Sequence, residues 1–264
     1  MSSTVSKPLP TSLLTVAGCR LDYRVMNESG LRPTVVFLHD GLGSIELWRT
    51  FPDDVVKATD HRGLVYSRYG HGWSDPATEP RPIDFVEREA LVVLPSVLEQ
   101  LDACVPVLIG HSDGGSISLV YAAHHPVAAL VLLAPHVFVE AVGLDTIATL
   151  GQQFADGELA GKMAKYHRDP VATFRAWNDV WLDRRFASWN IEYLLNRIEC
   201  PVLLIQGRDD EYGTMAQIDA IERQIAGPVE RVELNECGHA PHLSQPALTL
   251  EATVDFVRNA CGRA

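Results

Sequence analysis

The feature that most limits the fold of this chain is an alternation of short apolar runs with helix-like stretches. The apolar runs are residues 34–38, 64–67, 105–109, 129–133 and 202–206, with a further candidate strand at 229–234. Helical patterns lie at about 83–102, 113–124, 214–226 and 247–260. Because most of the runs are apolar throughout, they indicate strands that are buried on both faces. The alternation requires crossover connections, so we expect an α/β fold with a mainly parallel sheet and helices on both faces.

The N-terminal part of the chain predicts an antiparallel hairpin at one edge of the sheet. Residues 12–16 and 20–25 have strand-like patterns and are separated by a turn at Ala17 and Gly18. With this hairpin, the predicted sheet has about eight strands.

The stretch 136–200 departs from the alternation, since it contains no convincing strand and is rich in helix formers and aromatic residues. We expect it to form a helical cap inserted into one core domain. That core domain would consist of residues 1–135 and 201–264.

Aromatic residues in this stretch follow a helical spacing. Phe174, Trp177 and Trp181 are separated by three and four residues, which places them on one face of a helix. This face could belong to an ordinary amphipathic helix that packs on the core. Alternatively, it could also line a substrate cavity, with Trp177 and Trp181 as candidate substrate-binding residues.

The charge of the chain limits the class of partner. Lys and Arg number 22 and Asp and Glu number 34, which gives a net charge of −12. Negative charge repels the phosphate backbone and anionic lipid surfaces, so we expect neither a nucleic-acid nor a membrane partner. The expected partner is a small-molecule substrate, and the sequence contains no signal for an oligomeric state.

Cysteines and apolar segments indicate a cytoplasmic protein. The five cysteines form no CxxC pair and are widely spaced, so we expect reduced thiols. The first ten residues lack the features of a signal peptide, and no stretch reaches the roughly 18 uncharged apolar residues of a membrane span.

Residues 110–114 read Gly-His-Ser-Asp-Gly, which is a G-x-S-x-G motif between an apolar run and a helical pattern. A nucleophilic serine needs this setting, because a tight strand-to-helix turn holds its Oγ out over the ends of the strands. Ser112 is therefore the candidate nucleophile. The alternative is a glycine-rich turn with an ordinary helix-capping serine.

A serine nucleophile needs a base, and the base needs an acid that orients it. Candidate acids follow the run 202–206 as Asp209, Asp210 and Glu211, and candidate bases follow the run 229–234 as His239 and His242. The carboxyl ends of parallel strands meet at one edge of the sheet, so these segments can converge on Ser112. The order Ser, Asp, His is one of the known chain orders of this triad.

Several motifs together resemble those of α/β-hydrolase-fold proteins, and the resemblance covers nearly the whole chain. They are LHDGLGS at 38–44, YGHGWSD at 69–75, the Ser112 turn, Gly207-x-x-Asp210 and Gly238-His239-x-Pro241. The resemblance implies that Asp210 is the acid, with Asp209 and Glu211 beside it. It also implies that His239, and not His242, is the base.

The resemblance further implies an oxyanion hole. One donor would be the backbone N–H of Asp113, and the other would be that of Gly41 or Leu42. The usual His-Gly pair of the family is His39-Asp40 in this chain. Asp40 is either a turn residue that bonds its own backbone or a contact to a polar group of the substrate.

Acidic side chains near these positions predict a negative rim around the cleft. The carboxylates of Asp113, Asp40 and Glu211 would favour neutral or cationic substrates over anionic ones. Asp113 could instead be a residue stabilised at the N-terminus of a helix. His39, His111 and His136 are expected to line or support the cleft, with His136 as a candidate substrate-binding residue.

No cofactor or metal is expected. Gly41-x-Gly43 lacks the remainder of a dinucleotide-binding motif, and His239-x-x-His242 has no third ligand nearby. With Ser112, His239 and Asp210 as the candidate catalytic residues, the predicted activity is that of a serine hydrolase that cleaves a small or medium carboxylic ester through an acyl-enzyme.

Other reactions could use the same three residues. The alternatives are a carbon–carbon bond hydrolase or a lactonase of aromatic-compound degradation, a cofactor-free oxygenase or perhydrolase, and a non-enzymatic ligand receptor. Relatives that open epoxides or remove halides carry an aspartate at the nucleophile position, so Ser112 argues against both of these reactions.

Overall fold

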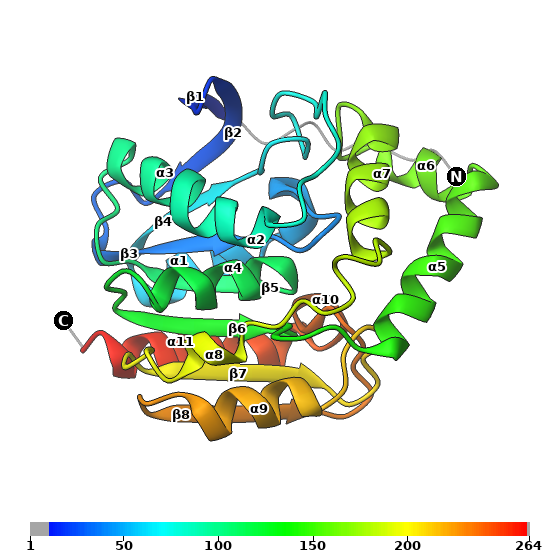
Figure 1. The fold of residues 1–264 in the computed structure, drawn as a ribbon. Coiled ribbons are helices and arrows are strands. Elements are labelled where there is room, and N and C mark those ends of the chain that lie inside the picture. The colour runs from blue at the N-terminus through cyan, green and yellow to red at the C-terminus, as the bar shows by residue number, and fades with distance from the viewer. Residues whose placement is uncertain (1–10, 263–264) are drawn as a thin grey trace.

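Eight strands form one sheet in the order β1-β2-β4-β3-β5-β6-β7-β8 (Figure 1). They are β1 (Ser12–Val16), β2 (Cys19–Met26), β3 (Leu31–Leu38), β4 (His61–Tyr66), β5 (Val107–His111), β6 (Ala129–Leu133), β7 (Val202–Gly207) and β8 (Val229–Leu234). β2 pairs antiparallel with β1 and with β4, and all other neighbouring strands are parallel. The expected mainly parallel sheet of about eight strands, with an antiparallel hairpin at its edge, is confirmed.

The computed structural model describes residues 11–262. The first ten residues, in which the sequence predicts no signal peptide, lie outside the described part. The five cysteines are free thiols.

The central strands bury both of their faces, which explains their continuous apolar sequences. In β3, Val36 and Leu38 pack into one hydrophobic cluster, while Val35 and Phe37 pack into a second cluster on the opposite face. All four side chains are almost fully buried. Alternate residues of one strand therefore anchor two separate layers of helices.

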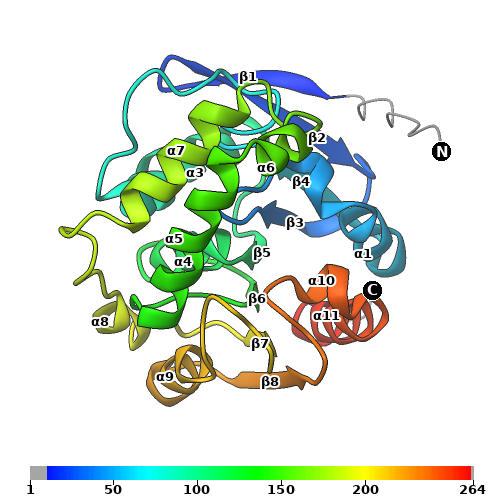
Figure 2. The ribbon, with the colours of Figure 1, turned by 90° about the vertical axis from the view of Figure 1, so that its right-hand side faces the viewer.

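Helices cover both faces of the sheet. Figure 2 shows α3, α4, α8 and α9 on one side of the strands and α1 and α11 on the other. The helices outside the connection from β6 to β7 are α1 (Phe51–Thr59), α2 (Phe85–Arg88), α3 (Leu94–Gln100), α4 (Asp113–Ala122), α9 (Ala216–Gln224), α10 (Pro241–Ser244) and α11 (Pro246–Ala260), with a 3-10 turn η1 (Ile45–Trp48) and a π-helical stretch η2 (Glu89–Val93).

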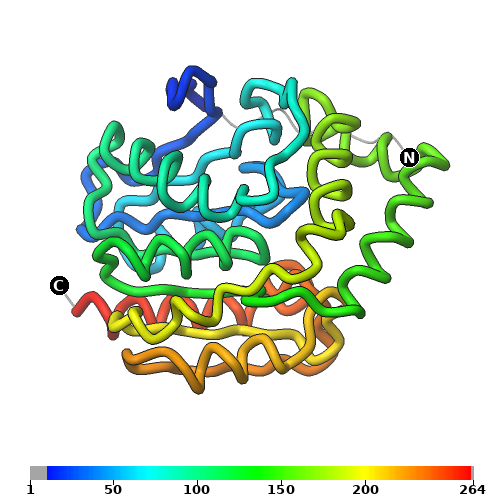
Figure 3. The backbone as a smooth tube through the Cα atoms, viewed as in Figure 1, coloured from blue at the N-terminus to red at the C-terminus, as the bar shows by residue number. Residues whose placement is uncertain are grey.

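The connection from β6 to β7 contains four helices, α5 (Ala141–Ala155), α6 (Glu158–Met163), α7 (Pro170–Trp181) and α8 (Glu192–Leu195). In Figures 1 and 3 the chain leaves the end of β6, rises beyond the strand ends through α5 to α6, comes back down through α7, and returns to the sheet through α8. The start of α7 is well defined, because Asp169 accepts a hydrogen bond from the N–H of Ala172 at 2.9 Å and Pro170 occupies the first turn.

Two predicted elements differ from the observed ones. The single helix expected at 83–102 is divided into α2, η2 and α3. Pro95 has no N–H to donate to the carbonyl four residues earlier, and the wider π-helical stretch precedes it.

The second difference is that β4 begins earlier than its apolar run predicts. His61 and Arg62 are polar but only 3% exposed, and His61 Nδ1 donates to the carbonyl of Pro33 at 2.7 Å.

Candidate active site

Ser112 lies in the turn between β5 and α4. Its backbone has φ 53° and ψ −117°, a conformation that side-chain-bearing residues rarely adopt. The turn is possible because its neighbours are glycines. A Cβ on Gly114 would collide with the carbonyl of Leu38, and a Cβ on Gly110 would collide with the carbonyl of Gly114. The G-x-S-x-G spacing thus allows a close approach of β3, β5 and α4 around Ser112.

A row of hydrogen bonds joins Ser112, His239 and Asp210. His239 Nε2 lies 2.8 Å from Ser112 Oγ, and His239 Nδ1 lies 2.9 and 2.8 Å from the two carboxylate oxygens of Asp210. With its hydrogen on Nδ1, His239 donates to Asp210 and accepts from the serine hydroxyl. This is the geometry that a general base needs in order to activate a serine.

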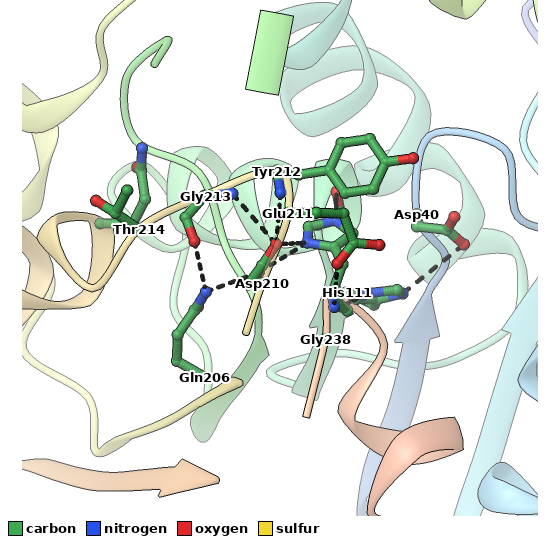
Figure 4. Close-up of polar contacts among 12 residues, drawn as sticks. Asp40, His111, Gln206, Asp210, Glu211, Tyr212, Gly213, Thr214 and Gly238 are labelled. Atoms are coloured by element: carbon green, nitrogen blue, oxygen red, sulfur yellow. Dashed lines mark hydrogen bonds and ion pairs between the residues drawn. The ribbon is translucent and has the colours of Figure 1, made fainter. Parts of the chain in front are cut away.

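The loop after β7 holds Asp210 in position (Figure 4). Its Oδ1 accepts from the N–H of Tyr212 at 2.8 Å and of Gly213 at 3.2 Å, and its Oδ2 accepts from Gln206 Nε2 at 2.7 Å. Burial alone would raise the pKa of Asp210. The hydrogen bond from His239 and its positive charge outweigh burial, and together with the Tyr212 N–H they lower this pKa below its ordinary value.

The pKa of His239 moves in the opposite direction. Burial alone would lower this pKa, but the hydrogen bond to Asp210 and the negative charges of Asp210, Asp40 and Glu211 raise it above the ordinary value.

His242 is placed elsewhere, in α10, where its ring centroid lies 4.8 Å from that of Trp48. The structure thus brings Asp210 and His239, and not His242, to Ser112.

Ser112 and His239 face a cavity of about 350 Å³. Other residues that the sequence singles out also line it: Asp40, Gly41, Leu42, His111, Asp113, His136, Trp177, Trp181 and Glu211. His136 packs beside His239 with ring centroids 5.4 Å apart, and burial lowers the pKa of His136 to about 3, so its ring is neutral. His39 is not part of the cavity lining.

Residues 40–43, which we call the 40–43 loop, follow β3, and Asp40, Gly41 and Leu42 of this loop line the cavity. Within the described residues, no hydrogen bond uses the backbone N–H of Gly41 or Leu42. Asp113 is the first residue of α4, where a backbone N–H has no partner within the helix. These three lining residues therefore have N–H groups available for a negatively charged oxygen.

Of the two alternatives for Asp113, the structure shows the residue at the N-terminus of a helix, buried in the first turn of α4 and not exposed at the rim of the cleft. The side chain is 1% exposed, and its carboxylate lies 3.9 Å from Arg68 and 3.8 Å from Arg81. Burial raises its pKa, and the two arginines act against this rise. The acidic groups nearer to solvent are Asp40, whose side chain is 32% exposed, and Glu211, which is exposed.

Asp40 does not bond its own backbone through its carboxylate. Its Oδ1 instead lies 3.8 Å from His111 Nδ1, as Figure 4 shows. The nearby turn uses the main chain, because the N–H of Gly43 donates to the carbonyl of Asp40 at 3.2 Å.

Several lining residues are missed by reasoning from the sequence. They include Glu140, which directly precedes α5, Gly143 and Ile147 from α5, Tyr212 from the Asp210 loop, and Leu243 and Ser244 from α10. The position of Tyr212, two residues after Asp210, is the one usable signal. Which residues of α5 face the cavity depends on how that helix packs, and the sequence does not specify this packing.

Residues 11–262 contain no group of three or more His, Cys, Asp or Glu side chains arranged to hold a metal ion. Of the helices in the same part of the chain, not one has both the length and the apolar character that crossing a bilayer requires.

Comparison with known proteins gives both a family and individual relatives. The model of the alpha/beta hydrolase family matches residues 35–252. The chain is 28% identical over 258 residues to the putative carbamate hydrolase RutD of Pseudomonas savastanoi pv. phaseolicola (strain 1448A / Race 6), which covers 84% of this chain and 93% of that protein.

A second relative is the serine hydrolase BPHL of Homo sapiens, 25% identical over 178 residues. The match covers 62% of this chain and spans only 58% of the length of the human protein. Among solved structures, that of Est816, an N-acyl homoserine lactone degrading enzyme, matches with a TM-score of 0.71 and 25% identity, covering 93% of this chain and 100% of that chain.

The family model extends from β3 into α11 and so includes the whole parallel part of the sheet, the Ser112 turn and the loops that carry Asp210 and His239. The chain belongs to the α/β hydrolase family.

Proposed function

We propose that this chain is a serine hydrolase that cleaves a small or medium carboxylic ester through an acyl-enzyme. The observation that supports this most is the row of hydrogen bonds from Ser112 through His239 to Asp210, which opens on a cavity of about 350 Å³. A serine that is hydrogen-bonded to a histidine oriented by a carboxylate is the arrangement of nucleophilic acyl transfer.

The first half of the reaction acylates the serine. Ser112 Oγ attacks the ester carbonyl carbon while His239 Nε2 takes the hydroxyl proton. The N–H of Asp113 and that of Gly41 or Leu42 donate to the oxyanion, and each donor of this kind contributes roughly 3–4 kcal/mol. The tetrahedral intermediate then collapses, the bond to the alcohol oxygen breaks, and His239 gives its proton to the leaving alcohol.

The second half releases the acid. Water attacks the acyl carbon of the Ser112 ester while His239 takes a proton from the water. When the second tetrahedral intermediate collapses, the bond to Ser112 Oγ breaks and the proton returns to the serine. Asp210 remains ionised throughout and stabilises the imidazolium form of His239.

The segment 136–200 would act as the cap over a core of residues 1–135 and 201–264. Its helices contribute Ile147, Trp177 and Trp181 to the cavity lining. These side chains are almost fully buried and apolar on most of their surface, which supports an uncharged acyl group as their ligand.

The charge of the lining supports neutral or cationic substrates over anionic ones. The acidic lining residues are Asp40, Asp113, Glu140 and Glu211, and none of the described lining residues is Lys or Arg. The two arginines beside Asp113 offset part of this negative charge from behind it. A negatively charged carboxylate on the substrate would therefore enter a cavity whose lining also carries negative charge.

A lactone is the second candidate substrate. The likeness to Est816, which degrades N-acyl homoserine lactones, favours it. Opening a lactone is the same acyl transfer, except that the leaving alcohol stays attached to the acyl group. The carbamate hydrolase activity given to RutD would need a carbamoyl group in the place of the acyl group.

Covalent labelling tests the proposed nucleophile. A fluorophosphonate probe should modify Ser112, seen as an added mass on the peptide that carries it, and His239→Ala should slow the labelling strongly. His242→Ala is the matched control, because His242 lies outside the cavity lining. Labelling at another residue, or equal rates in the two variants, would contradict the proposal.

A further inference from the structure

Ring nitrogens of three buried histidines contact three successive backbone carbonyls of the 40–43 loop. The contacts are His39 Nδ1 with the carbonyl of Asp40 at 2.7 Å, His71 Nε2 with that of Gly41 at 3.0 Å, and His167 Nε2 with that of Leu42 at 3.0 Å. The three histidines are 1–2% exposed. Histidine ring nitrogens thus lie against three consecutive carbonyls of one short loop. His71 has competing contacts, because its Nδ1 lies 3.0 Å from the carbonyl of Tyr69 and its Nε2 also lies 3.0 Å from Arg81 Nη2.

For His39 and His167, the contact of the other ring nitrogen fixes which nitrogen donates. The N–H of Gly72 donates to His167 Nδ1 at 3.0 Å, so the hydrogen of the neutral ring is on Nε2 and is donated to Leu42. In His39 the hydrogen is on Nδ1, because the N–H of Arg68 donates to its Nε2 at 3.0 Å, and Nδ1 therefore donates to the carbonyl of Asp40. Burial keeps both rings neutral, since it lowers the pKa of His167 to about 4 and that of His39 well below its ordinary value.

These contacts orient the peptide groups of the loop. In a planar trans peptide the C=O and the next N–H point in opposite directions. Holding the carbonyl of Asp40 on the histidine side therefore turns the N–H of Gly41 away from it. The carbonyl of Gly41 lies beside His71, so the N–H of Leu42 also points away from the histidines. Holding the carbonyl of Leu42 fixes the following peptide, whose Gly43 N–H closes the turn onto the carbonyl of Asp40 at 3.2 Å.

His167 differs from the other two histidines in its origin. It lies between α6 and α7, in the helical connection from β6 to β7, whereas the loop follows strand β3 of the sheet. The same connection makes further contacts beside the loop: Arg168 N–H donates to the carbonyl of Gly72 at 2.8 Å, and Thr173 Oγ1 donates to that of Gly70 at 2.6 Å.

Trp177 of α7 also packs directly on the loop. A Cβ on Gly41 would collide with the indole nitrogen of Trp177. The helical connection therefore contacts the loop through both a hydrogen bond and close packing, and only His167 bonds one of the loop carbonyls from that connection.

We propose that His167 is a positioning residue through which the helical connection from β6 to β7 holds the 40–43 loop in the geometry that binds the oxyanion. This inference rests on the proposed function, because the loop has an oxyanion only if Ser112 attacks a carbonyl. His167 reaches neither the substrate nor the reacting atoms, since it is not part of the cavity lining.

Three variants separate this role from general support of the fold. His167→Leu removes the donor to Leu42, and His167→Gln keeps a donor at nearly the same place. Thr173→Val is the matched control, because it removes a buried bond of the same connection that ends on Gly70 and not on the loop. The measurements are kcat and KM on a p-nitrophenyl ester and hydrogen exchange of a peptide that spans the 40–43 loop.

For His167→Leu we expect a roughly tenfold fall in kcat with little change in KM, less than the 10²–10³-fold loss on removing an oxyanion donor itself. Hydrogen exchange in the loop should become faster. His167→Gln should restore most of kcat, and Thr173→Val should change neither kcat nor the exchange of the loop.

Equal kcat and equal loop exchange in His167→Leu and Thr173→Val would overturn the positioning role. A failure of the proposed function is distinguishable from this result, because hydrolysis by the wild type would then persist in Ser112→Ala. Loop exchange is measured without turnover, so unchanged exchange in His167→Leu overturns the inference whichever reaction the protein catalyses.

Discussion

Gln206 donates from Nε2 to the Oδ2 oxygen of Asp210 at 2.7 Å, and the same nitrogen donates to the carbonyl of Gly213 at 3.1 Å. Gln206 lies in β7 and is 1% exposed, so it cannot easily change its position. The carboxylate is therefore anchored to the sheet on one side and to its own loop on the other. This support fixes the orientation of Asp210 independently of its bond to His239.

Asp210→Asn should lower kcat by about 10⁴-fold, because an amide at this position no longer holds His239 in the tautomer that accepts the serine proton. Asp209→Asn is the matched control, since Asp209 is exposed and has no side-chain contact with His239. Steady-state kinetics on one ester compares the two. Similar losses in both variants would rule out the assignment of Asp210 as the acid.

The rate should depend on pH through His239. The base must be neutral to accept the serine proton, so kcat/KM rises with pH through the pKa of His239, which lies above its ordinary value of 6.5. In Asp210→Asn the hydrogen bond and the charge that raise this pKa are lost, so the midpoint should move to lower pH. A pH profile of residual activity measures this shift, and an unchanged midpoint would contradict the stated cause.

Two glycine substitutions should change stability in opposite directions. Gly114→Ala places a Cβ against the backbone carbonyls of Leu38 and His39, so the free energy of unfolding should fall by roughly 1–3 kcal/mol or more. Gly161→Ala in the exposed α6 meets nothing within 4 Å, and the better helix propensity should raise the free energy of unfolding by up to about 1 kcal/mol. Urea unfolding monitored by tryptophan fluorescence measures both, and a harmless Gly114→Ala would contradict the close packing at the Ser112 turn.

Substrate charge should affect the rate. A neutral p-nitrophenyl butyrate should be hydrolysed about tenfold faster than the similar monoanionic succinate ester, because a charge near Asp40 and Glu211 meets repulsion of the order of a kcal/mol. Glu211→Gln should narrow this ratio, while Glu230→Gln on the exposed β8 should not. Equal rates for the two esters in the wild type would remove the proposed charge preference.

The parallel sheet could be predicted from the sequence because burial on both faces leaves a direct mark, as in Val35 to Leu38 of β3. The same rule fails for β4, where His61 and Arg62 are buried although polar. Their burial depends on partners far along the chain, such as the Pro33 carbonyl for His61. The division of the helix before Pro95 is a local effect that the periodicity of the apolar residues does not reveal.

For the site, the sequence predicts positions close to strand ends better than positions on the helical connection. Ser112, Asp210 and His239 each follow a strand, so their convergence follows from the topology of a parallel sheet. Ile147 of α5 and Glu140, which precedes this helix, face the cavity because of how α5 packs, which no local pattern specifies. The burial of Asp113 could not be predicted either, because Arg68 and Arg81 approach it from distant segments.

The proposed reaction is the hydrolysis of an ester with Ser112 as the nucleophile. Its most direct test is the hydrolysis of p-nitrophenyl esters from acetate to decanoate by the wild type and by Ser112→Ala, with folding of the variant checked by circular dichroism. Turnover by the wild type should peak at one acyl length and should be lost in Ser112→Ala. Equal hydrolysis by both proteins at every length, or none by the wild type, would contradict it.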